Sequence, residues 1–132
     1  MNKQNGSLIN SLEGHTSSVL SVCVTPDDGS LIISGSKDHS IKIWDMHTMN
    51  LKNTLEGHTS DVCTVCVSPD GSLIISGSKD KSIKIWNMHS RERELKKTLE
   101  GHSADVCSVC VSPDGSLIIS GSLDKMIYIW AI

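Results

Sequence analysis

The stretch TLEGHTSDVCTVCVSPDGSLIISGSKDKSIKIW, residues 54–86, decides the fold of this chain because the chain repeats it. Residues 98–130 differ from it at only six of 33 positions, and a more diverged copy fills residues 11–44. The repeat period is therefore 43 to 44 residues. Self-similarity at that length indicates a solenoid or a propeller, in which no single unit buries its apolar face alone.

Each copy carries one large aromatic ring, because tryptophan occurs only at Trp44, Trp86 and Trp130, and phenylalanine is absent. The core is therefore expected to consist mainly of Ile, Val, Leu and Cys. The formal net charge is -3, and the Lys and Arg residues are spread through the copies. Nucleic-acid-binding proteins usually present a concentrated basic surface, so the sequence predicts no binding to DNA or RNA.

The amino terminus, MNKQNGSLIN, lacks the basic and then apolar segments of a signal peptide, and no apolar run approaches the length of a membrane span. The five cysteines are odd in number and recur at repeat positions. This cysteine usage suits a reducing compartment. Together these features predict a soluble intracellular protein of the cytoplasm or nucleus, with no membrane partner and no cofactor.

Four short strands are expected in each copy. In the second copy, β-forming residues fill 61–67 and stop at the Ser-Pro-Asp-Gly sequence of residues 68–71, where Pro and Gly suit a turn. A continuous apolar run over 73–78 and an alternating segment over 82–86 predict two further strands. Residues 95–102 supply a fourth, outer strand. Gly, Ser and Pro recur too often for helices.

The order Gly-His, Ser-Pro-Asp-Gly, Ile-Ser-Gly-Ser-Lys-Asp and Ile-Lys-Ile-Trp, at about 43 residues per copy, closely resembles the WD-repeat β-propeller family over nearly the whole chain. The signature dipeptide remains as Trp44-Asp45 but becomes Trp86-Asn87 and Trp130-Ala131. The resemblance implies an all-β fold with three four-stranded blades. The repeats are expected over residues 13–55, 56–99 and 100–132.

The resemblance also implies a hydrogen-bonded tetrad in each blade, in which an Asp meets a His, the His meets a Ser, and the Ser meets the indole N–H of a Trp. The three tetrads are His15, Ser34, Asp38 and Trp44; His58, Ser76, Asp80 and Trp86; and His102, Ser120, Asp124 and Trp130. A Ser, His and Asp together also suggest a hydrolase triad. Three identical sets, the included Trp and the lack of a Gly-x-Ser-x-Gly elbow favour a structural network. The sequence therefore predicts no catalytic residue and no enzyme.

Two Cys-x-x-Cys pairs, Cys63 with Cys66 and Cys107 with Cys110, have the spacing of metal-binding or redox motifs. Residues three apart on a strand face opposite sides and lie roughly 10 Å apart, which is too far for a shared metal or a disulfide. The sequence therefore predicts no metal site at these pairs.

The first copy keeps one cysteine of the pair, Cys23, and has Leu20 at the other position. A position that accepts leucine does not require a thiol. Cys23 and its equivalents Cys66 and Cys110 are therefore expected to be small, buried apolar residues. His47 and His89, in the repeated Met-His pairs, are expected to be loop residues that bind no metal.

Residues 6–12, GSLINSL, precede the first Gly-His as an outer strand would, whereas no outer strand follows the third strand of the last copy. Three blades cannot close a ring, since propellers have about four to eight, and an open arc exposes apolar faces and a strand edge. Residues 6–12 of one chain are therefore predicted to pair with residues 123–130 of the next. A homodimer of six blades is favoured over a homotrimer of nine. A fragment of a longer propeller is the remaining alternative.

WD-repeat propellers generally act as rigid platforms, so the resemblance implies a non-catalytic scaffold that binds a protein or peptide. The rim that it assigns to partners consists of Ser18, Leu20, Lys37, Asp61, Cys63, Lys79, Asp105, Cys107 and Leu123. The alternative is a structural or model propeller, from recent blade duplication or design, with no dedicated ligand. The near-identity of the second and third copies favours that alternative, because an asymmetric partner tends to need blades that differ.

Overall fold

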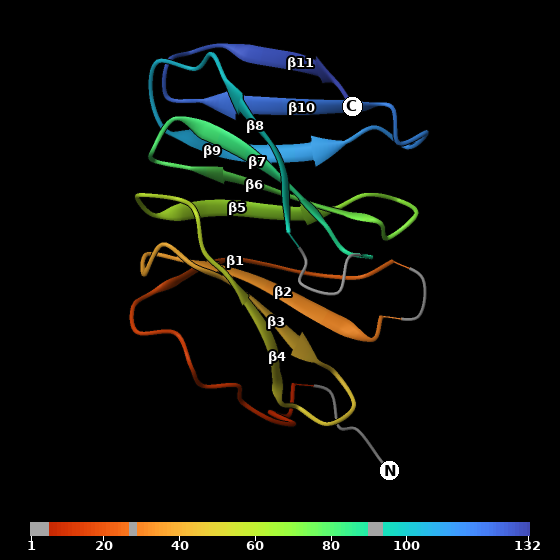
Figure 1. Cartoon of the computed structure of the whole chain (residues 1–132). Helices are drawn as coiled ribbons and strands as arrows, with labels where there is room; N and C mark the ends of the chain where they lie inside the picture. Colours follow the sequence, from red (N-terminus) through yellow and green to blue (C-terminus); the bar gives the residue numbers. More distant parts are fainter. Residues whose placement is uncertain (1–5, 27–28, 90–93) are drawn as a thin grey trace.

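The protein consists of antiparallel β-sheets stacked one on another (Figure 1). In the computed structural model, residues 6–26, 29–89 and 94–132 are described and contain eleven strands in three sheets. The parts of the predicted amino terminus and repeats at residues 1–5, 27–28 and 90–93 lie outside the described residues. No helix capable of crossing a membrane occurs in the described ranges. The all-β fold predicted from the sequence is confirmed.

Each sheet is one blade, and the blades follow the chain in order. Blade 1 contains β1 (Val19–Val24), β2 (Leu31–Ser36), β3 (Ile41–Asp45) and β4 (Leu51–Leu55). Blade 2 contains β5 (Val62–Val67), β6 (Leu73–Ser78), β7 (Ser82–Asn87) and β8 (Leu95–Glu100). Blade 3 contains β9 (Val106–Val111), β10 (Leu117–Ser122) and β11 (Ile127–Ala131).

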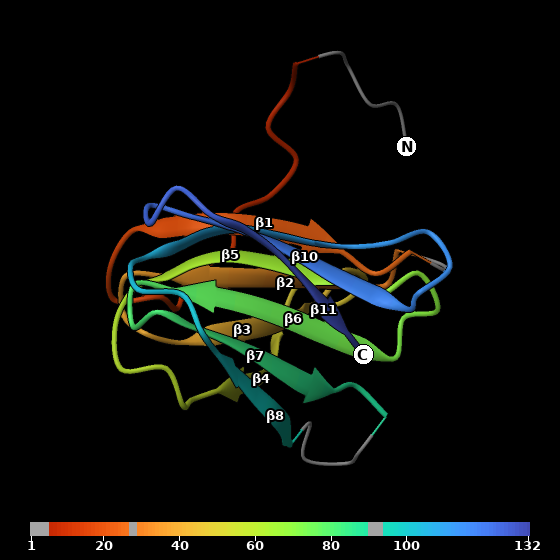
Figure 2. The same cartoon turned by 90° about the horizontal axis from the view of Figure 1, so that it is seen from above.

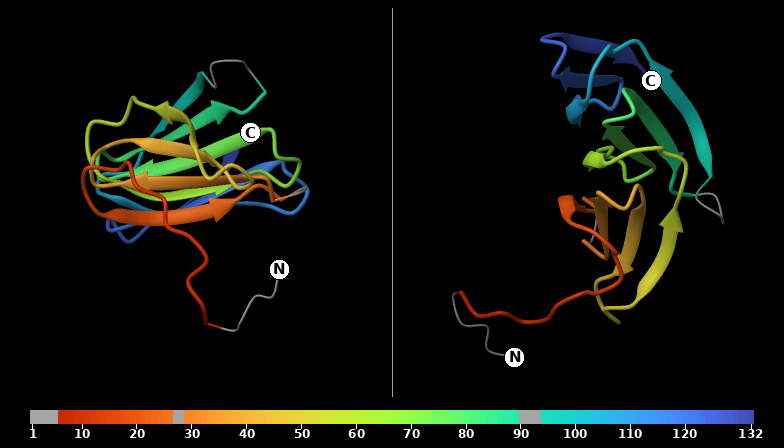
Figure 3. Two further views of the ribbon diagram at one scale, coloured as in Figure 1. Left: turned by 90° about the horizontal axis from the view of Figure 1, so that it is seen from below. Right: turned by 90° about the vertical axis from the view of Figure 1, so that its left-hand side faces the viewer.

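The blades form an open arc. The right-hand view of Figure 3 shows the first strands, β1, β5 and β9, along the concave side, and the fourth strands, β4 and β8, along the convex side. One end of the arc is a face of blade 1 and the other end is a face of blade 3. We call these two surfaces the blade 1 end face and the blade 3 end face.

Turn chemistry sets the strand lengths, as the sequence predicted. The Gly71 amide donates a hydrogen bond to the Ser68 carbonyl at 2.9 Å, which closes the turn between β5 and β6. Gly71 has a φ of 76°, a conformation that strongly favours glycine. Gly115 repeats this geometry in blade 3 with a φ of 77°. Each blade therefore begins with a tight hairpin that aligns its first two strands.

Two apolar cores lie between the blades and not within them. In the first core, Ile33, Ile41 and Ile43 of blade 1 pack against Val62 and Val65 of blade 2. The second core repeats this arrangement between blades 2 and 3. Because a sheet has two faces, each blade needs a neighbour on both sides to bury its apolar residues. Only blade 2 has both neighbours, and all six residues of its β6 are buried.

One expectation needs correction, and another concerns an assembly that a single chain does not contain. Residues 6–12, predicted to pair as an outer strand with a second chain, form no strand in the single chain and extend beyond blade 1 (Figure 2). The sheet edge that lacks a fourth strand is β11, at the far end of the arc, so this segment has no partner within reach. Cys110, predicted to be buried, is exposed, whereas Cys23 and Cys66 are half-buried. Cys23 and Cys66 pack against the cores between blades, and the equivalent surface around Cys110 is the uncovered blade 3 end face.

Candidate functional site

The structure places the four residues of each predicted tetrad in one hydrogen-bonded chain. In blade 2, His58 Nδ1 lies 2.7 Å from Asp80 Oδ2, and His58 Nε2 lies 2.7 Å from Ser76 Oγ. The indole N–H of Trp86 donates to the same Ser76 oxygen at 3.0 Å. This pattern assigns the Nδ1–H tautomer to a neutral His58. Nδ1–H then donates to Asp80, and Nε2 accepts a hydrogen bond from the Ser76 hydroxyl. The tetrad ties the segment before β5 to the middle of β6, to the turn between β6 and β7, and to the end of β7.

Blades 1 and 3 repeat the tetrad with nearly the same distances. The His–Asp distance is 2.8 Å in both blades, and the His–Ser distance is 2.7 Å in both. The two indole N–H groups donate to the serine oxygens at 2.9 Å. An exposed blade face therefore does not disturb the network, because its partners all belong to one blade.

The ionisation of the tetrad residues follows from burial and hydrogen bonding. Burial lowers the pKa of His58 and outweighs the opposing effect of Asp80, so the imidazole stays neutral. Burial alone would raise the pKa of Asp80, but hydrogen bonds from Ser82 and His58 outweigh it and lower the pKa to about 2. The pKa of Asp38 is likewise lowered, by Ser40 and His15 against the effect of burial. The tetrad of blade 2 thus holds a carboxylate against a neutral histidine.

The tetrad serines are unsuited to nucleophilic attack. Ser76 and Ser120 are fully buried, and Ser34 is 4% exposed. Each oxygen is occupied by a histidine and an indole, as the distances above show. A substrate carbonyl could not approach without dismantling the network. The arrangement supports a structural role for these residues.

The Gly-His dipeptide supports the tetrad by backbone proximity. A Cβ atom added at Gly57 would lie 3.1 Å from the outermost carbon of the Trp86 ring, and one at Gly14 only 2.8 Å from that of Trp44. Glycine therefore lets the backbone approach the edge of the indole closely. The histidine that follows can then reach the serine to which the indole also donates.

The rim is the edge of the arc where β1, β5 and β9 begin. One rim residue per blade is the extra residue of a β-bulge: Leu20 at the β1–β2 pair, Cys63 at β5–β6 and Cys107 at β9–β10. A bulge shifts the alternation of side chains along a strand. The predicted opposite orientation of Cys63 and Cys66 assumed a regular strand and did not anticipate this bulge.

A second set of rim residues is fixed by backbone hydrogen bonds. The amides of Lys37, Lys79 and Leu123 donate to the carbonyls of Ser18, Asp61 and Asp105 of their own blades at 2.9, 3.0 and 3.0 Å. The Lys79 ammonium lies 3.4 Å from the Asp61 carboxylate. This ion pair is half-exposed, so it orients the two side chains more than it stabilises the fold. The structure therefore brings all nine predicted rim residues to the same edge.

The cysteines are free thiols in the described residues. Burial raises the pKa of Cys23 to about 11 and that of Cys66 to about 12, which makes both poor nucleophiles. Within the described ranges no three His, Cys, Asp or Glu residues are grouped to hold a metal ion. Their raised pKa values and their positions beside the cores assign Cys23 and Cys66 a packing role.

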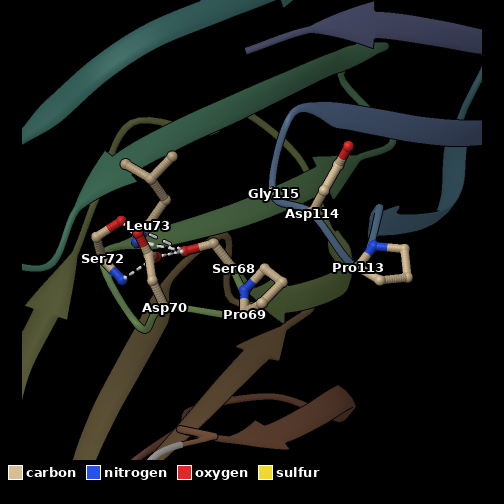
Figure 4. A pocket seen from close by; sticks show the side chains of 8 residues that line it. All are labelled: Ser68, Pro69, Asp70, Ser72, Leu73, Pro113, Asp114 and Gly115. Carbon is tan, nitrogen blue, oxygen red and sulfur yellow. Dashed lines mark hydrogen bonds between the residues drawn. The ribbon is translucent and has the colours of Figure 1, made fainter.

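A cleft that the sequence did not predict lies at the opposite edge from the rim, between the hairpin turns of blades 2 and 3 (Figure 4). Its polar groups are used within the turns: Asp70 Oδ1 accepts hydrogen bonds from Ser68 Oγ at 2.8 Å and from Ser72 Oγ at 2.6 Å. These hydrogen bonds, led by those of Ser72, lower the pKa of Asp70 to about 2. The repeated Ser-Pro-Asp-Gly sequence could have indicated this cleft, because two such turns line it. Their polar side chains serve to form the turns.

Comparison with known proteins agrees with this architecture. A family model described as WD domain, G-beta repeat, matches residues 6–45, 49–87 and 93–131. Nuclear distribution protein PAC1 of Candida albicans is 56% identical to this chain over 39 residues, which cover 30% of the chain and 8% of that relative. The matched region is thus a small part of the relative's length. With its three matched repeats and three blades, the chain belongs to the WD-repeat family.

Proposed function

We propose that this chain is a non-catalytic scaffold for protein or peptide partners, and that copies associate head to tail to close a propeller. WD repeats commonly serve in protein interaction, which supports the scaffold. One observation carries the self-association: the two exposed end faces are copies of faces that pack together inside the chain. The blade 3 end face of one copy would receive the blade 1 end face of another.

The blade 1 end face lacks the cover that its equivalents have. Val62 and Val65 of blade 2 are 0% and 5% exposed, because they pack over Gly35 of blade 1. The equivalent residues of blade 1, Val19 and Val22, are 51% and 65% exposed. Two valines that would otherwise fill a core therefore face solvent at this end of the arc.

The blade 3 end face shows the complementary gap. Ile83 and Ile85 of blade 2 are 0% and 3% exposed, whereas their equivalents Ile127 and Ile129 are 74% and 68% exposed. A Cβ added at Gly77 would lie 2.7 Å from a methyl group of Val106, but one added at Gly121 would meet no atom within 4 Å. The surface that receives valines at the internal junctions is thus vacant here.

The amino-terminal segment supports the same direction of assembly. Residues 8–12, LINSL, align with the sequences LKNTL of β4 and LKKTL of β8. The segment leaves blade 1 on the side away from blade 2, as Figures 1 and 3 show. There Leu12 lines a pocket with Ile32 and Met46 of blade 1. The equivalent Leu55 packs in the first core with the equivalents of those two residues, Ile74 and Met88.

Leu12 therefore already lies beside blade 1 as Leu55 lies against blade 2. From there the segment could add as a fourth strand beside β11 of a second copy. The added strand would provide backbone partners for the outer edge of β11. Two copies would give six blades, within the usual range of four to eight, and three would give nine. We therefore favour the dimer.

Closure would join the rims of the copies into one ring and present a continuous surface to a partner. We assign ligand binding to this rim and place the protein in the cytoplasm or nucleus, where its free cysteines would stay reduced. The competing function, a propeller without a ligand, draws support from the near-identical second and third repeats. Replacing Asp61 by Asn and Lys79 by Gln separates the two: a specific partner should be lost, whereas a ligand-free propeller has no partner to lose.

Cysteine reactivity provides the test of closure. Cys107 and Cys110 are both exposed in the single chain. In the closed ring Cys110 would acquire the surroundings of Cys66, whose thiol pKa burial raises to about 12. Iodoacetamide labelling, followed by peptide mass spectrometry, should show Cys110 losing reactivity relative to Cys107 as protein concentration rises. A labelling ratio that is independent of concentration would contradict closure.

A further inference from the structure

The repeats differ at the rim in a pattern that links the two ends of the chain. Two blades carry a rim lysine, Lys37 and Lys79, but blade 3 carries Leu123 at that position. Two blades carry a rim aspartate, Asp61 and Asp105, but blade 1 carries Ser18. The exceptions therefore fall at opposite ends of the chain. They would lie on the two sides of a junction between blade 3 of one copy and blade 1 of another.

Within the chain these positions meet across a blade junction. The pKa of Lys79 is raised first by its hydrogen bond to Asp61 of its own blade and by the charge of that residue. The charge of Asp105 in the next blade raises it further. A Cβ added at Gly77 would lie 2.7 Å from Val106, so the rim ends of β6 and β9, where Lys79 and Asp105 lie, meet at this junction. At a junction between copies, Leu123 would take the lysine position and Ser18 the aspartate position.

A nearby rim position in blade 1 also becomes more hydrophobic. Leu20 of blade 1 is the bulge residue that corresponds to Cys63 and Cys107, and it is 39% exposed. Leu123 is 64% exposed. A lysine at position 123 would keep Asp105 of its own blade as a partner, as Lys79 keeps Asp61, but across the junction it would meet a serine and a leucine instead of an aspartate. A leucine there gains an apolar neighbour. Charge and hydrophobicity therefore change together on both sides of one junction.

The outer strands carry a second matched exception. The Lys42 ammonium donates to the Thr54 hydroxyl of β4 at 3.1 Å, and the Lys84 ammonium donates to that of Thr98 in β8 at 3.0 Å. Blade 3 has Tyr128 in place of the lysine, and residues 8–12 have Ser11 in place of the threonine. If residues 8–12 pair with β11 of a second copy, a tyrosine–serine pair would replace there the lysine–threonine contact found inside the chain.

We propose that Leu123 with Leu20, and Tyr128 with Ser11, form a dedicated contact that directs blade 3 of one copy to blade 1 of a second copy. The partner recognised by this surface is another copy of the same chain. This inference rests on the closed ring proposed above. It adds that the junction between copies is apolar at the rim, where the internal junction between blades 2 and 3 has Lys79 on one side and Asp105 on the other.

A double-mutant cycle at the rim tests the assignment. Leu123→Lys places a cation against Leu20, and Ser18→Asp places an anion against Leu123, so in each single variant the opposite copy supplies no counter-charge across the junction. Each should raise the dissociation constant of the assembly by about tenfold, as expected for the loss of roughly 1.4 kcal/mol. The double variant recreates the arrangement of Lys79 and Asp105 and should return to within about threefold of the unmodified chain.

Sedimentation velocity over a dilution series gives the dissociation constants, and thermal melting of each variant at low concentration confirms that it folds. Leu95→Lys is the matched control: Leu95 is an exposed leucine of blade 2, away from both end faces, and its replacement should leave association unchanged. If the unmodified chain associates but the single variants match it, or their effects simply add, the rim assignment is wrong and the ring stands. A chain that stays at 14.3 kDa throughout would overturn both.

Discussion

Two equivalent glycines should respond in opposite ways to the same substitution. A Cβ added at Gly77 would lie 2.7 Å from Val106 Cγ1 and 2.8 Å from Thr64 Cγ2, well inside ordinary contact distances of 3.4–4 Å. Overpacking of this kind costs about 1–3 kcal/mol. Replacing glycine by alanine also restricts the unfolded chain, which returns about 0.4–1 kcal/mol. Gly77→Ala should therefore lower the free energy of unfolding by about 1–2 kcal/mol.

Gly121→Ala makes no such contact in the single chain, because no atom lies within 4 Å of the added Cβ. The monomer should therefore be unchanged or more stable by up to about 1 kcal/mol. In a closed ring of two chains, the new methyl group would meet valines of the neighbouring copy at both junctions. At about 1–3 kcal/mol per junction, association should weaken by about 30-fold to 25,000-fold.

Urea unfolding at dilute concentration, followed by tryptophan fluorescence, measures the first effect, and sedimentation measures the second. The comparison is controlled internally, since both variants make the same chemical change at equivalent positions of two nearly identical repeats. Equal stability of Gly77→Ala and the unmodified chain would refute the packing between blades 2 and 3. Unimpaired association of Gly121→Ala would refute the head-to-tail contact.

Three further predictions concern the tetrads and the thiols. His58→Ala should lower stability by about 1–3 kcal/mol because it leaves buried partners unsatisfied, whereas replacement of the exposed His47 should not; equal melting temperatures for the two variants would remove the tetrad's structural role. The pKa of His58 is lowered from 6.5 and that of Asp80 from 3.8 to about 2, so the unfolded chain binds more protons in acid. Stability should therefore hold above pH 6.5, decline below it as the histidine of the unfolded chain takes up a proton that folded His58 resists, and decline again between about pH 4 and pH 2. Measuring the melting temperature from mildly alkaline to acid solution tests this, and a fall toward alkaline pH would contradict it. Finally, burial raises the pKa of Cys66 to about 12, so at pH 8 it should react with iodoacetamide far more slowly than the exposed Cys107, and comparable rates would mean that the core around Cys66 is open.

Much of the fold could be predicted because each repeat carries its own turn chemistry. Ser68-Pro69-Asp70-Gly71 stops one strand and starts the next, and the structure places β6 at the predicted residues 73–78. The tetrad geometry could be anticipated only through the family resemblance. No spacing in one sequence tells that His58 and Ser76, 18 residues apart, are neighbours.

Other features depend on neighbours that a sequence pattern does not contain. The same Val-Cys-Val pattern gives a half-buried Cys66 and an exposed Cys110, because a further blade covers only the first. The bulges at Leu20, Cys63 and Cys107 could not be recognised from alternation, since a bulge is the point where alternation fails. Residues 6–12 resemble an outer strand, yet a strand requires an edge to pair with, and that edge lies across the arc.

Solution mass tests the central claim most directly. Light scattering coupled to size-exclusion chromatography, over a range of loading concentrations, measures the mass of the associated species without labels or variants. Head-to-tail closure predicts a discrete species at twice the 14.3 kDa chain mass, which would give six blades. A species at three times that mass would mean a nine-bladed ring. A single species of 14.3 kDa at every concentration would contradict the proposed assembly.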